Sequence, residues 1–562
     1  MSTSAAPVPH GNAESGEYSH RQVLTILSGL LLGMFLAALD QTIVSTAIRT
    51  IADDLHGLDA QAWATTAYLI TSTITTPIYG KLGDLWGRKK LFMFAIVVFT
   101  IGSVLCSFST SMYELAAFRA FQGLGAGGLM TLVLAIIGDI VSPRERAKYT
   151  GYFMATFGTS SVLGPVIGGF LAGADSILGI TGWRWVFLVN LPIGIFAIAV
   201  VFRTLHVHHQ RREARVDWMG AVALVVCLVP LLTVLEQGRS WGWGSAGAVA
   251  CFVVAAVGLV AFVVIERRMK DDALIPLELF TIRPAAVTIV ASVIVGAALF
   301  GGMMLLPLYM QIVHGASPTQ AGFMMLPMVA GMMTASITAG RIISRTGRTR
   351  LFPIFGSLTM GLGMLLLAQI DADTRLWLVM IFMASVGYGV GNCMQPLILT
   401  VQSAVPPTAI GVATSSATFF RQIGGTMGVA VFLSLLFGLV GGNIQDEMKA
   451  ELPSVAAAAK AGDFTPNATD QRVLAGDSAL LSGLTEDSSV INEMSEPVAH
   501  PIKQGFAESM TPVFWSAAGL GLLAFLVLLL MPEVELRSTS AMAARAAAGA
   551  TSSGPAGPAE PT

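Results

Sequence analysis

Long apolar runs alternate with short polar segments from about residue 23 to residue 531. A helix needs roughly 20 apolar residues to cross the hydrocarbon core of a bilayer, and most of these runs have that length. The pattern therefore predicts an all-α membrane protein with about fourteen transmembrane helices. The expected spans lie at about 23–48, 63–80, 91–110, 114–140, 147–173, 184–203, 217–236, 245–266, 285–313, 319–340, 351–370, 375–402, 408–440 and 511–531.

Lysine and arginine gather in every second loop between these runs. The basic loops lie within residues 81–90, 144–148, 203–215, 267–283 and 341–350, whereas the alternate short loops hold only Arg49, Arg239 and Arg375. Loops rich in Lys and Arg stay on the cytoplasmic side of a membrane. We therefore expect both termini in the cytoplasm, which agrees with an even number of spans.

Three segments differ from the apolar pattern. Residues 1–22 form a polar tail, and residues 532–562 form an Ala, Gly, Pro and Ser-rich tail that we expect to be disordered and cytoplasmic. Residues 441–508 are polar and should lie outside, as a partly helical or disordered loop between the last two spans. Trp183 and Trp185 are placed where an interfacial aromatic belt belongs.

The chain repeats itself. The stretch "GKLGDLWGRKK" at 80–90 aligns with "GRIISRTGRTR" at 340–350, and "GLGAGGLM" at 123–130 aligns with "GYGVGNCM" at 387–394. An ordered series of matches at nearly constant offset predicts two six-helix halves, as in transporters built from parallel repeats. The expected division is 23–203 for the first half, 204–284 for a linker with two extra helices, and 285–531 for the second half.

Composition narrows the function classes. Hydrophobic residues make up 54% of the chain and charged residues 12%, and the net charge of −2 gives no reason to expect nucleic acid. The four cysteines lie in apolar runs, which indicates buried thiols. No phosphate-binding Gly-Lys-Ser/Thr loop is present, so ATP is excluded as the energy source. His206, His208 and His209 fit a solvated basic loop better than a metal site, and we expect no enzyme, no metal and no cofactor.

Several motifs together resemble the major facilitator superfamily, and most closely its fourteen-span drug:proton antiporter branch. The resemblance covers residues 23–531. "GKLGDLWGRKK" is similar to the family's loop motif between spans 2 and 3, "LAAFRAFQGLGAGG" (115–128) to its span-4 motif, and "LDQTIVSTAI" (39–48) to the acidic motif of span 1. Ser45 and Arg49 stand where the branch usually has Asn and Pro.

The stretch "GTSSVLGPVIGG" (158–169) is unusual because it places helix breakers inside an apolar run. It resembles the span-5 antiporter motif, whose second glycine is replaced here by Ser160. The matching residues are Gly151, Gly164, Pro165, Gly168 and Gly169. Small residues let membrane helices approach closely, and the resemblance implies a bias toward antiport. Helix packing without a directional role is the alternative.

Asp40 and Arg119 are ionisable groups within predicted spans 1 and 4. Such groups are costly in a membrane and are usually functional. Asp40 is the expected proton-coupling residue or the contact for a cationic drug, and Arg119 is expected to tune a carboxylate such as Asp40. Structural roles for both remain open from the sequence.

The loop after span 2 contains the charged residues Asp84, Arg88 and Lys89, flanked by Gly80 and Gly87. The resemblance implies a cytoplasmic latch between spans 2 and 11 that holds the outward-facing state. The alternative is that the basic residues only set the membrane orientation. That alternative leaves Asp84 and the paired glycines unexplained.

A second set of candidates lies mainly in the second half of the chain. Arg421 is an intramembrane cation without a counterpart in the first half, and it is expected either to contact substrate or to balance charge. Methionine and aromatic side chains suit an adaptable apolar cavity, although lipid-facing or packing roles remain open for each. The candidates are Trp63, Met303, Met304, Met324, Met325, Tyr388, Phe419 and Phe420.

The resemblance implies a monomeric transporter in a bacterial cytoplasmic membrane. It would export lipophilic drugs or antibiotics in exchange for protons, with the proton gradient as its energy source. A dedicated exporter of one endogenous metabolite, lipid or self-made antibiotic is the main alternative. A transporter-like sensor is the second alternative, and the combination of Asp40, Arg119 and the span-5 motif argues against it.

Overall fold

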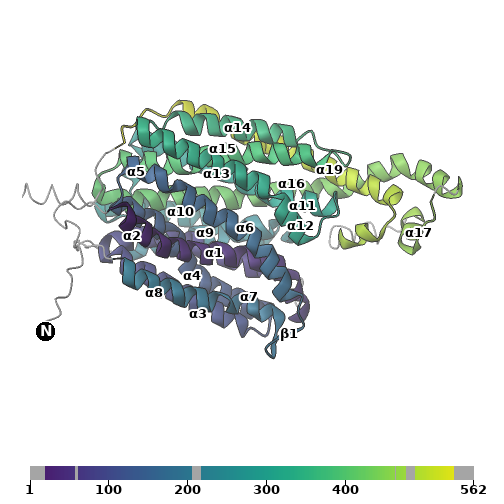
Figure 1. Ribbon diagram of the computed structural model, residues 1–562, viewed down its shortest axis with the longest axis horizontal. Coiled ribbons are helices and arrows are strands. Elements are labelled where there is room, and N and C mark those ends of the chain that lie inside the picture. Colours follow the sequence, from purple (N-terminus) through teal and green to yellow (C-terminus); the bar gives the residue numbers. More distant parts are fainter. Residues whose placement is uncertain (1–18, 57–60, 206–216, 462–463, 476–487, 537–562) are drawn as a thin grey trace, which may run out of the picture.

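The computed structural model describes residues 19–56, 61–205, 217–461, 464–475 and 488–536, which form a bundle of long helices (Figure 1). The first group consists of α1 (His20–Asp54), α2 (Gln61–Trp86), α3 (Arg88–Ser107), α4 (Met112–Ile140), α6 (Thr150–Ala172) and α8 (Asn190–Thr204). Next come α9 (Trp218–Trp241) and α10 (Ala246–Met269). The second group consists of α11 (Arg283–Ile312), α13 (Leu326–Thr346), α14 (Leu351–Leu367), α15 (Leu376–Ala404), α16 (Ile410–Ala461) and α19 (Glu496–Leu529).

Short elements join or extend the long helices. They are α5 (Pro143–Arg146), η2 (Ala147–Tyr149), η3 (Gly182–Arg184), α7 (Trp185–Leu188), η4 (Lys270–Asp272), η5 (Leu277–Phe280), α12 (Pro318–Met324), η6 (Pro407–Ala409), α17 (Ala468–Leu474) and η7 (Ser488–Glu493). The strands β1 (Ser176–Ile177) and β2 (Ile180–Thr181) pair in an antiparallel hairpin between α6 and η3. This two-residue hairpin is a small departure from the expected all-α architecture.

Each predicted apolar run lies on one of the long helices. Twelve helical segments in the described part of the chain are long and apolar enough to cross a membrane. The two remaining predicted spans coincide with α14, which is apolar but has only 17 residues, and with α2, which contains many hydroxyl side chains.

The hydroxyl groups of α2 are compatible with an apolar environment because the helix satisfies them itself. Thr71, Thr75 and Thr76 each donate to the carbonyl oxygen four residues earlier, over 2.8–3.0 Å. A hydroxyl that bonds to its own helix does not leave an unpaired polar group. Hydropathy alone therefore underestimates how well α2 fits inside the bundle.

The two groups of helices repeat the same neighbour relationships. In the first group α4 packs against α2 and α3, and α1 packs against α6. In the second group α15 packs against α13 and α14, and α11 packs against α16. These equivalent pairs agree with the internal repeat, and Figure 1 shows the groups side by side with the second above the first.

The helices α9 and α10 pack against each other, and α9 also contacts α2 of the first group and α16 of the second. Their apolar contacts include Leu224 and Leu228 of α9, Ile70 and Ile74 of α2, and Phe419 of α16. The extra pair therefore lies beside the junction between the two groups.

The last two long helices continue beyond the rest of the bundle. Helix α16 has 52 residues and extends to Ala461, and α19 begins at Glu496. Their extensions and α17 protrude at the right of Figure 1. A Cβ on Gly505 of α19 would lie 2.7 Å from the Cα of Ile444, so the two extensions are in close contact. The segment 441–508, expected as a partly helical loop, is mostly helical in its described part.

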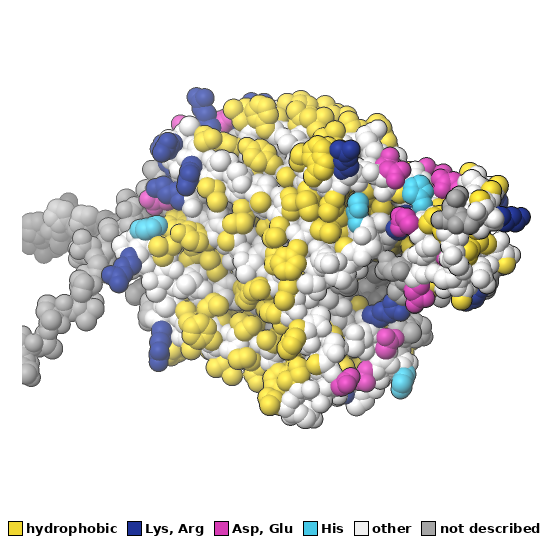
Figure 2. All heavy atoms as spheres, turned by 45° about the vertical axis from the view of Figure 1, so that its right-hand side comes forward, with side chains coloured by type: hydrophobic (Ala, Val, Ile, Leu, Met, Phe, Trp, Pro, Cys, Tyr) yellow, Lys and Arg dark blue, Asp and Glu magenta, His cyan; other side chains and the backbone are white. Residues whose placement is uncertain are grey.

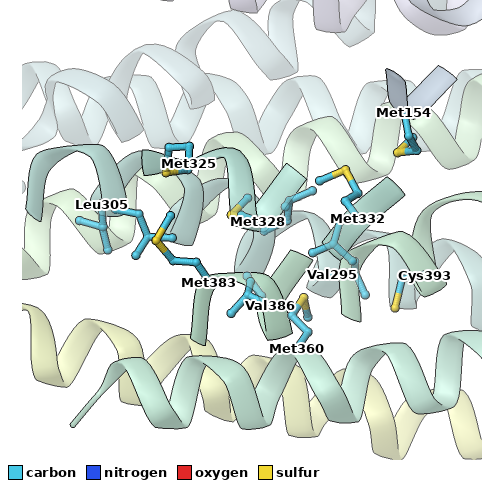
Figure 3. Packing of buried hydrophobic residues seen from close by; sticks show 14 of the residues in the cluster. Met154, Val295, Leu305, Met325, Met328, Met332, Met360, Met383, Val386 and Cys393 are labelled. Atoms are coloured by element: carbon cyan, nitrogen blue, oxygen red, sulfur yellow. The ribbon is translucent and has the colours of Figure 1, made fainter. Parts of the chain in front are cut away.

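Methionine side chains contribute strongly to the core of the second group. Figure 3 shows Met328 and Met332 of α13 near Met360 of α14 and Met383 of α15, and all four are buried. The outer surface is also apolar. In Figure 2 hydrophobic side chains cover the middle of the bundle, while Lys and Arg gather toward its left end. This distribution is that of a multi-pass membrane protein.

Candidate functional site

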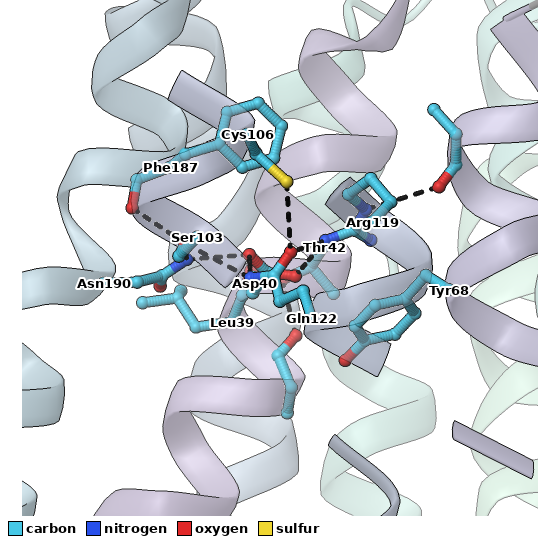
Figure 4. A network of polar contacts seen from close by, with 12 residues as sticks. Leu39, Asp40, Thr42, Tyr68, Ser103, Cys106, Arg119, Gln122, Phe187 and Asn190 are labelled. Carbon is cyan, nitrogen blue, oxygen red and sulfur yellow. Dashed lines mark hydrogen bonds and ion pairs between the residues drawn. The ribbon is translucent and has the colours of Figure 1, made fainter. Parts of the chain in front are cut away.

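A buried ion pair joins Asp40 of α1 to Arg119 of α4 (Figure 4). The Nη1 atom of Arg119 lies 2.6 Å from Oδ2 of Asp40, and both side chains are at most 1% exposed. The two sequence-predicted intramembrane charges of the first half are therefore in direct contact. Since their charges compensate each other, the pair is close to neutral as a unit.

Two amide side chains complete the surroundings of the Asp40 carboxylate. Gln122 Nε2 donates to Oδ1 over 2.9 Å, and Asn190 Nδ2 donates to the same oxygen over 2.7 Å. Both amides also donate to Oγ of Ser103, at 3.2 and 2.8 Å. The Ser103 hydroxyl in turn donates to the carbonyl oxygen of Phe187 over 3.0 Å. The Asp40 carboxylate thus receives three donors, from Arg119, Gln122 and Asn190.

Arg119 is held from three further directions. Its Nη1 donates to Gln122 Oε1 over 2.7 Å, and its Nε donates to the carbonyl oxygen of Ala64 over 3.3 Å. The guanidinium carbon lies 4.0 Å from the ring centroid of Tyr68, a cation–π contact. An arginine cannot lose its proton at accessible pH, so its position must be fixed by acceptors and by the aromatic ring.

The local sequence explains how these groups meet. Arg119 and Gln122 are three residues apart and therefore share one face of α4. A Cβ on Gly102 of α3 would lie 2.6 Å from the Cα of Gln122, and one on Gly123 would lie 2.6 Å from the Tyr68 carbonyl oxygen of α2. Glycine at these two positions lets α4 approach α3 and α2 closely enough for the polar side chains to connect.

The hydrogen bonds of this site depend on the negative charge of Asp40. When Asp40 becomes neutral, its attraction for the Arg119 guanidinium falls and the donors around it lose their anionic acceptor. Arg119 then requires another acceptor or access to water. The hydrogen bonds of this single carboxyl therefore connect side chains from α1, α3, α4 and α8.

Three polar members of this network were not predicted from the sequence. Gln122 lies within the quoted span-4 motif, and its position three residues after Arg119 was the available signal. Asn190 begins α8 in a segment read only for its tryptophans. No feature of the sequence pattern singled out Ser103. In the same segment Trp183 is buried and donates to Asp54 over 2.7 Å, so it is not a lipid-exposed anchor.

The residues of the span-5 motif all lie on α6. Some of them face α1, and the others face α12 or α13. A Cβ on Gly164 would lie 2.1 Å from Thr42 Oγ1, and one on Gly168 would lie 2.9 Å from the Ile43 carbonyl oxygen, both on α1. Gly151 instead faces Ile337 of α13. A Cβ on Gly322 of α12 would lie 3.2 Å from Cγ of Pro165, and one on Gly169 would lie 3.6 Å from Thr319 Oγ1. Helix α6 therefore packs against its own group and the opposite group at once.

Asp84 of α2 connects the two groups at the end of the bundle where α3 begins. Its Oδ2 accepts from the backbone amide of Val412 in α16 over 3.2 Å, and its Oδ1 accepts from Arg88 over 2.7 Å. Arg88 also lies 3.0 Å from Oδ2 of Asp139. A Cβ on Gly80 would lie 2.4 Å from Cβ of Ser415, so α2 and α16 are tightly packed here.

Other residues of this charged region have different partners. Gly87 has a φ of 96° at the junction of α2 and α3, a value that favours glycine. Lys89 donates to the Phe202 carbonyl oxygen over 2.9 Å, which places it against α8 and away from α16. Arg144 donates to the Ser344 carbonyl oxygen at the end of α13 over 2.8 Å, and this contact is a second connection between the groups.

The proposed cavity residues of the second group are dispersed. Phe420 packs edge-on against Phe419 and Phe280, with centroids 5.2 and 5.7 Å apart. Tyr388 is 41% exposed on α15. The side chains of Met303 and Met304 lie outside the described residues. Within the described part of the chain, no contact joins Phe420, Arg421 and Tyr388 into one pocket.

A comparison with family models matches residues 30–429 to the Major Facilitator Superfamily. The chain belongs to the major facilitator superfamily. Members of this superfamily are transporters of small molecules rather than enzymes, and they need no cofactor. The chain is thus a multi-pass membrane transporter of this superfamily, as the motifs indicated.

Two of the curated relatives come from Bacillus subtilis. The chain is 36% identical over 448 residues to the multidrug transporter protein MdtP of Bacillus subtilis, covering 80% of this chain and 81% of that one. It is 32% identical over 522 residues to multidrug resistance protein 3 of the same organism, covering 92% and 97%. Among solved superfamily structures, the proton:xylose symporter XylE matches with a TM-score of 0.58 at 15% identity, over 94% of this chain and 99% of that one. This last likeness concerns the fold.

Proposed function

We propose that this transporter is a proton-coupled antiporter that exports lipophilic drugs or antibiotics across a bacterial cytoplasmic membrane by alternating access. The observation on which this rests is the buried Asp40–Arg119 pair with its amide partners. In this proposal the Asp40 carboxylate takes up one proton, and the packing of α1, α3, α4 and α8 rearranges in response. The names of the bacterial relatives support drugs as the cargo.

The proposed topology has fourteen spans with both termini in the cytoplasm. The twelve apolar segments together with α2 and α14 account for fourteen helices. The alternation of basic loops gives the orientation. The proposed domains are the halves 23–203 and 285–531, joined by a linker at 204–284 that contains α9 and α10. The proton gradient serves as the energy source, and the functional unit is a monomer.

Two contacts between the helix groups support alternating access. Asp84 joins α2 to α16, and Arg144 joins α5 to α13, both at the end of the bundle we assign to the cytoplasm. We propose that these contacts hold the cytoplasmic side closed and break when the transporter turns inward. Helix α6 packs against α1 and against α12 and α13, so its tilt would link the motion of the groups to the Asp40 site.

A dedicated exporter of one metabolite, lipid or self-made antibiotic is the second candidate function. The Asp40 network fits either reading because it concerns coupling and not cargo. A drug panel in a sensitive host separates them: protection against several unrelated compounds supports the multidrug reading, and protection against one compound supports the dedicated exporter. A sensor would give no protection.

The decisive experiment is proton movement in proteoliposomes under an inward-directed pH gradient. Internal pH is followed after addition of ethidium or a tetracycline, for the wild type and for Asp40→Asn. We expect drug-dependent proton flux in the wild type and its loss in the variant, since the amide cannot take up a proton and leaves Arg119 without a counter-ion.

Asp53→Asn is the matched control, because Asp53 lies on the same helix with an exposed side chain. Its flux should equal that of the wild type. Unchanged flux in Asp40→Asn would remove Asp40 from the coupling path. No flux with any drug in folded wild-type protein would contradict the proposed antiport.

A further inference from the structure

Arg421 is the single Asp, Glu, Lys or Arg residue away from the ends of the six apolar runs of the second half. The charges of the first half within the membrane form a compensated pair, Asp40 with Arg119. The second half thus places one uncompensated positive charge among apolar helices. Such a residue is expensive in a bilayer and calls for an anionic partner.

The position of Arg421 on α16 is fixed by close packing against α11. A Cβ on Gly296 would lie 2.2 Å from the Arg421 carbonyl oxygen and 3.1 Å from its Cγ. The neighbouring residue Gln422 accepts from Thr76 of α2 over 3.1 Å. Arg421 therefore packs against α11, at the level along α16 where the next residue contacts α2 of the first group.

Arg421 is half-buried, and its side chain forms no hydrogen bond or ion pair with any residue in the described part of the chain. Three aspartates of the first group already have cationic partners. Asp40 pairs with Arg119, whereas Asp84 and Asp139 both pair with Arg88. Among the buried and half-buried Lys and Arg side chains that the structure describes, Arg421 is thus the exception, since the others have partners.

We propose that Arg421 binds the carboxylate of the transported compound, so that preferred substrates are lipophilic acids or zwitterions rather than simple lipophilic cations. This inference rests on the proposed export function and names the substrate class for it. A guanidinium presents a planar fork of N–H donors that matches a carboxylate. Phe419 and Phe420 precede it on α16, where their rings pack edge-on against each other.

The test compares ligands that differ only in that carboxylate. Rhodamine B carries a free carboxylate, whereas its ethyl ester is a lipophilic cation with the same ring system. Binding to purified protein is measured by fluorescence polarisation, together with four further pairs of aromatic carboxylic acids and their methyl esters as competitors. We expect wild-type protein to bind the acids roughly 10- to 100-fold more tightly than the esters, the size typical of a hydrogen bond to a charged group.

Arg421→Met should abolish this preference while leaving ester binding unchanged, and Arg421→Lys should retain part of it. Arg341→Met removes an arginine with an exposed side chain from α13 and should leave the preference intact. An arginine with only a structural role would not distinguish an acid from its ester. If no acid binds wild-type protein more tightly than its ester, or if Arg421→Met keeps the preference, the inference is wrong.

The binding and proton-flux experiments test the substrate class and the proposed proton coupling independently. Dye-driven proton flux without an acid preference would overturn the role of Arg421 and leave the proposed antiport in place. An acid preference that depends on Arg421, measured in protein that moves no protons, would support the substrate class and contradict the proposed coupling.

Discussion

A carboxylate enclosed by helices depends on the donors around it, and Asp40 has three of them. The central donor is Gln122, because its amide bonds to both charged members of the site, Asp40 and Arg119. It donates to Asp40 and Ser103, and its oxygen accepts from Arg119 and from the Cys106 thiol at 3.7 Å. Removing this one side chain would weaken the surroundings of both charges.

We therefore expect Gln122→Leu to lower the free energy of unfolding by about 3 kcal/mol, since it leaves buried donors and acceptors unpaired. Thermal unfolding of the purified protein in detergent provides the measurement. Gln395→Leu is the matched control, because Gln395 is also buried, on α15, and has no side-chain hydrogen bond to any described residue. Equal melting temperatures for the two variants would contradict the central role of Gln122.

The charged members of this site could be found from the sequence, whereas the uncharged ones gave a weak signal or none. Asp40 and Arg119 stand out because charge is rare inside apolar runs. Gln122 and Asn190 are neutral and fit many roles in a membrane helix. Asn190 also reaches Asp40 only because α8 packs against α1, a contact that no local pattern encodes.

At the scale of single elements, α6 shows that the residues of one sequence motif can have different contacts and therefore different roles. Its glycines occur at the spacing of a family motif, yet Gly164 and Gly168 contact α1, whereas Gly151 contacts α13 and Gly169 approaches Thr319. Spacing along a helix predicts which residues share a face. It does not predict which neighbour that face meets.

These contacts predict unequal effects within one motif. Gly164→Ala would place a methyl group against Thr42 on α1, and we expect a loss of about 2 kcal/mol of stability from overpacking. Gly169→Ala meets only Thr319 Oγ1 at an ordinary contact distance of 3.6 Å and should change stability little. Thermal melting and drug transport of both variants are compared with wild type. A larger loss in Gly169→Ala would show that the contacts of α6 are not as described.

Helix α16 illustrates a different limit of sequence patterns. Hydropathy places the end of its apolar run near residue 440, whereas the helix continues to Ala461. The residues beyond the apolar run include Ala, Glu, Lys and Met, which favour helix in water as well as in lipid. Apolarity therefore located the span, and intrinsic helix propensity set the length of the helix.

At the scale of the whole molecule, the number of spans and the orientation can be tested together. In protein whose four native cysteines are replaced by serine, single cysteines are introduced at exposed positions. Gly244 between α9 and α10 and Lys460 at the end of α16 should be modified from outside intact cells by a membrane-impermeant maleimide. Arg345 at the end of α13 should react only after the membrane is opened.

This labelling pattern follows from fourteen spans with cytoplasmic termini. Modification of position 345 in intact cells, or protection of position 244, would contradict the proposed topology. Position 460 also reports on the extension of α16, which should be accessible whichever way the transporter faces.

The repeat was visible in the sequence because the helix ends of both halves keep similar glycines. The sequence did not show where the extra pair packs. Helix α9 touches both α2 and α16, and its contact residues are ordinary apolar side chains such as Leu224 and Leu228. Side chains of this kind pack equally well against lipid or protein, so their pattern does not specify a neighbour.

Helix α16 is so long that a small tilt at one end displaces its other end by a large distance. From Ile410, next to the Asp84 contact, to Leu452, just before Pro453, the helix is uninterrupted and about 65 Å long, roughly twice the thickness of the bilayer core. A tilt that hardly changes the packing at the cytoplasmic end would move the opposite end of the helix by a much larger distance. The opening of a buried junction could then be followed on the cell surface, and a protein clamped onto that tip would hold the junction shut.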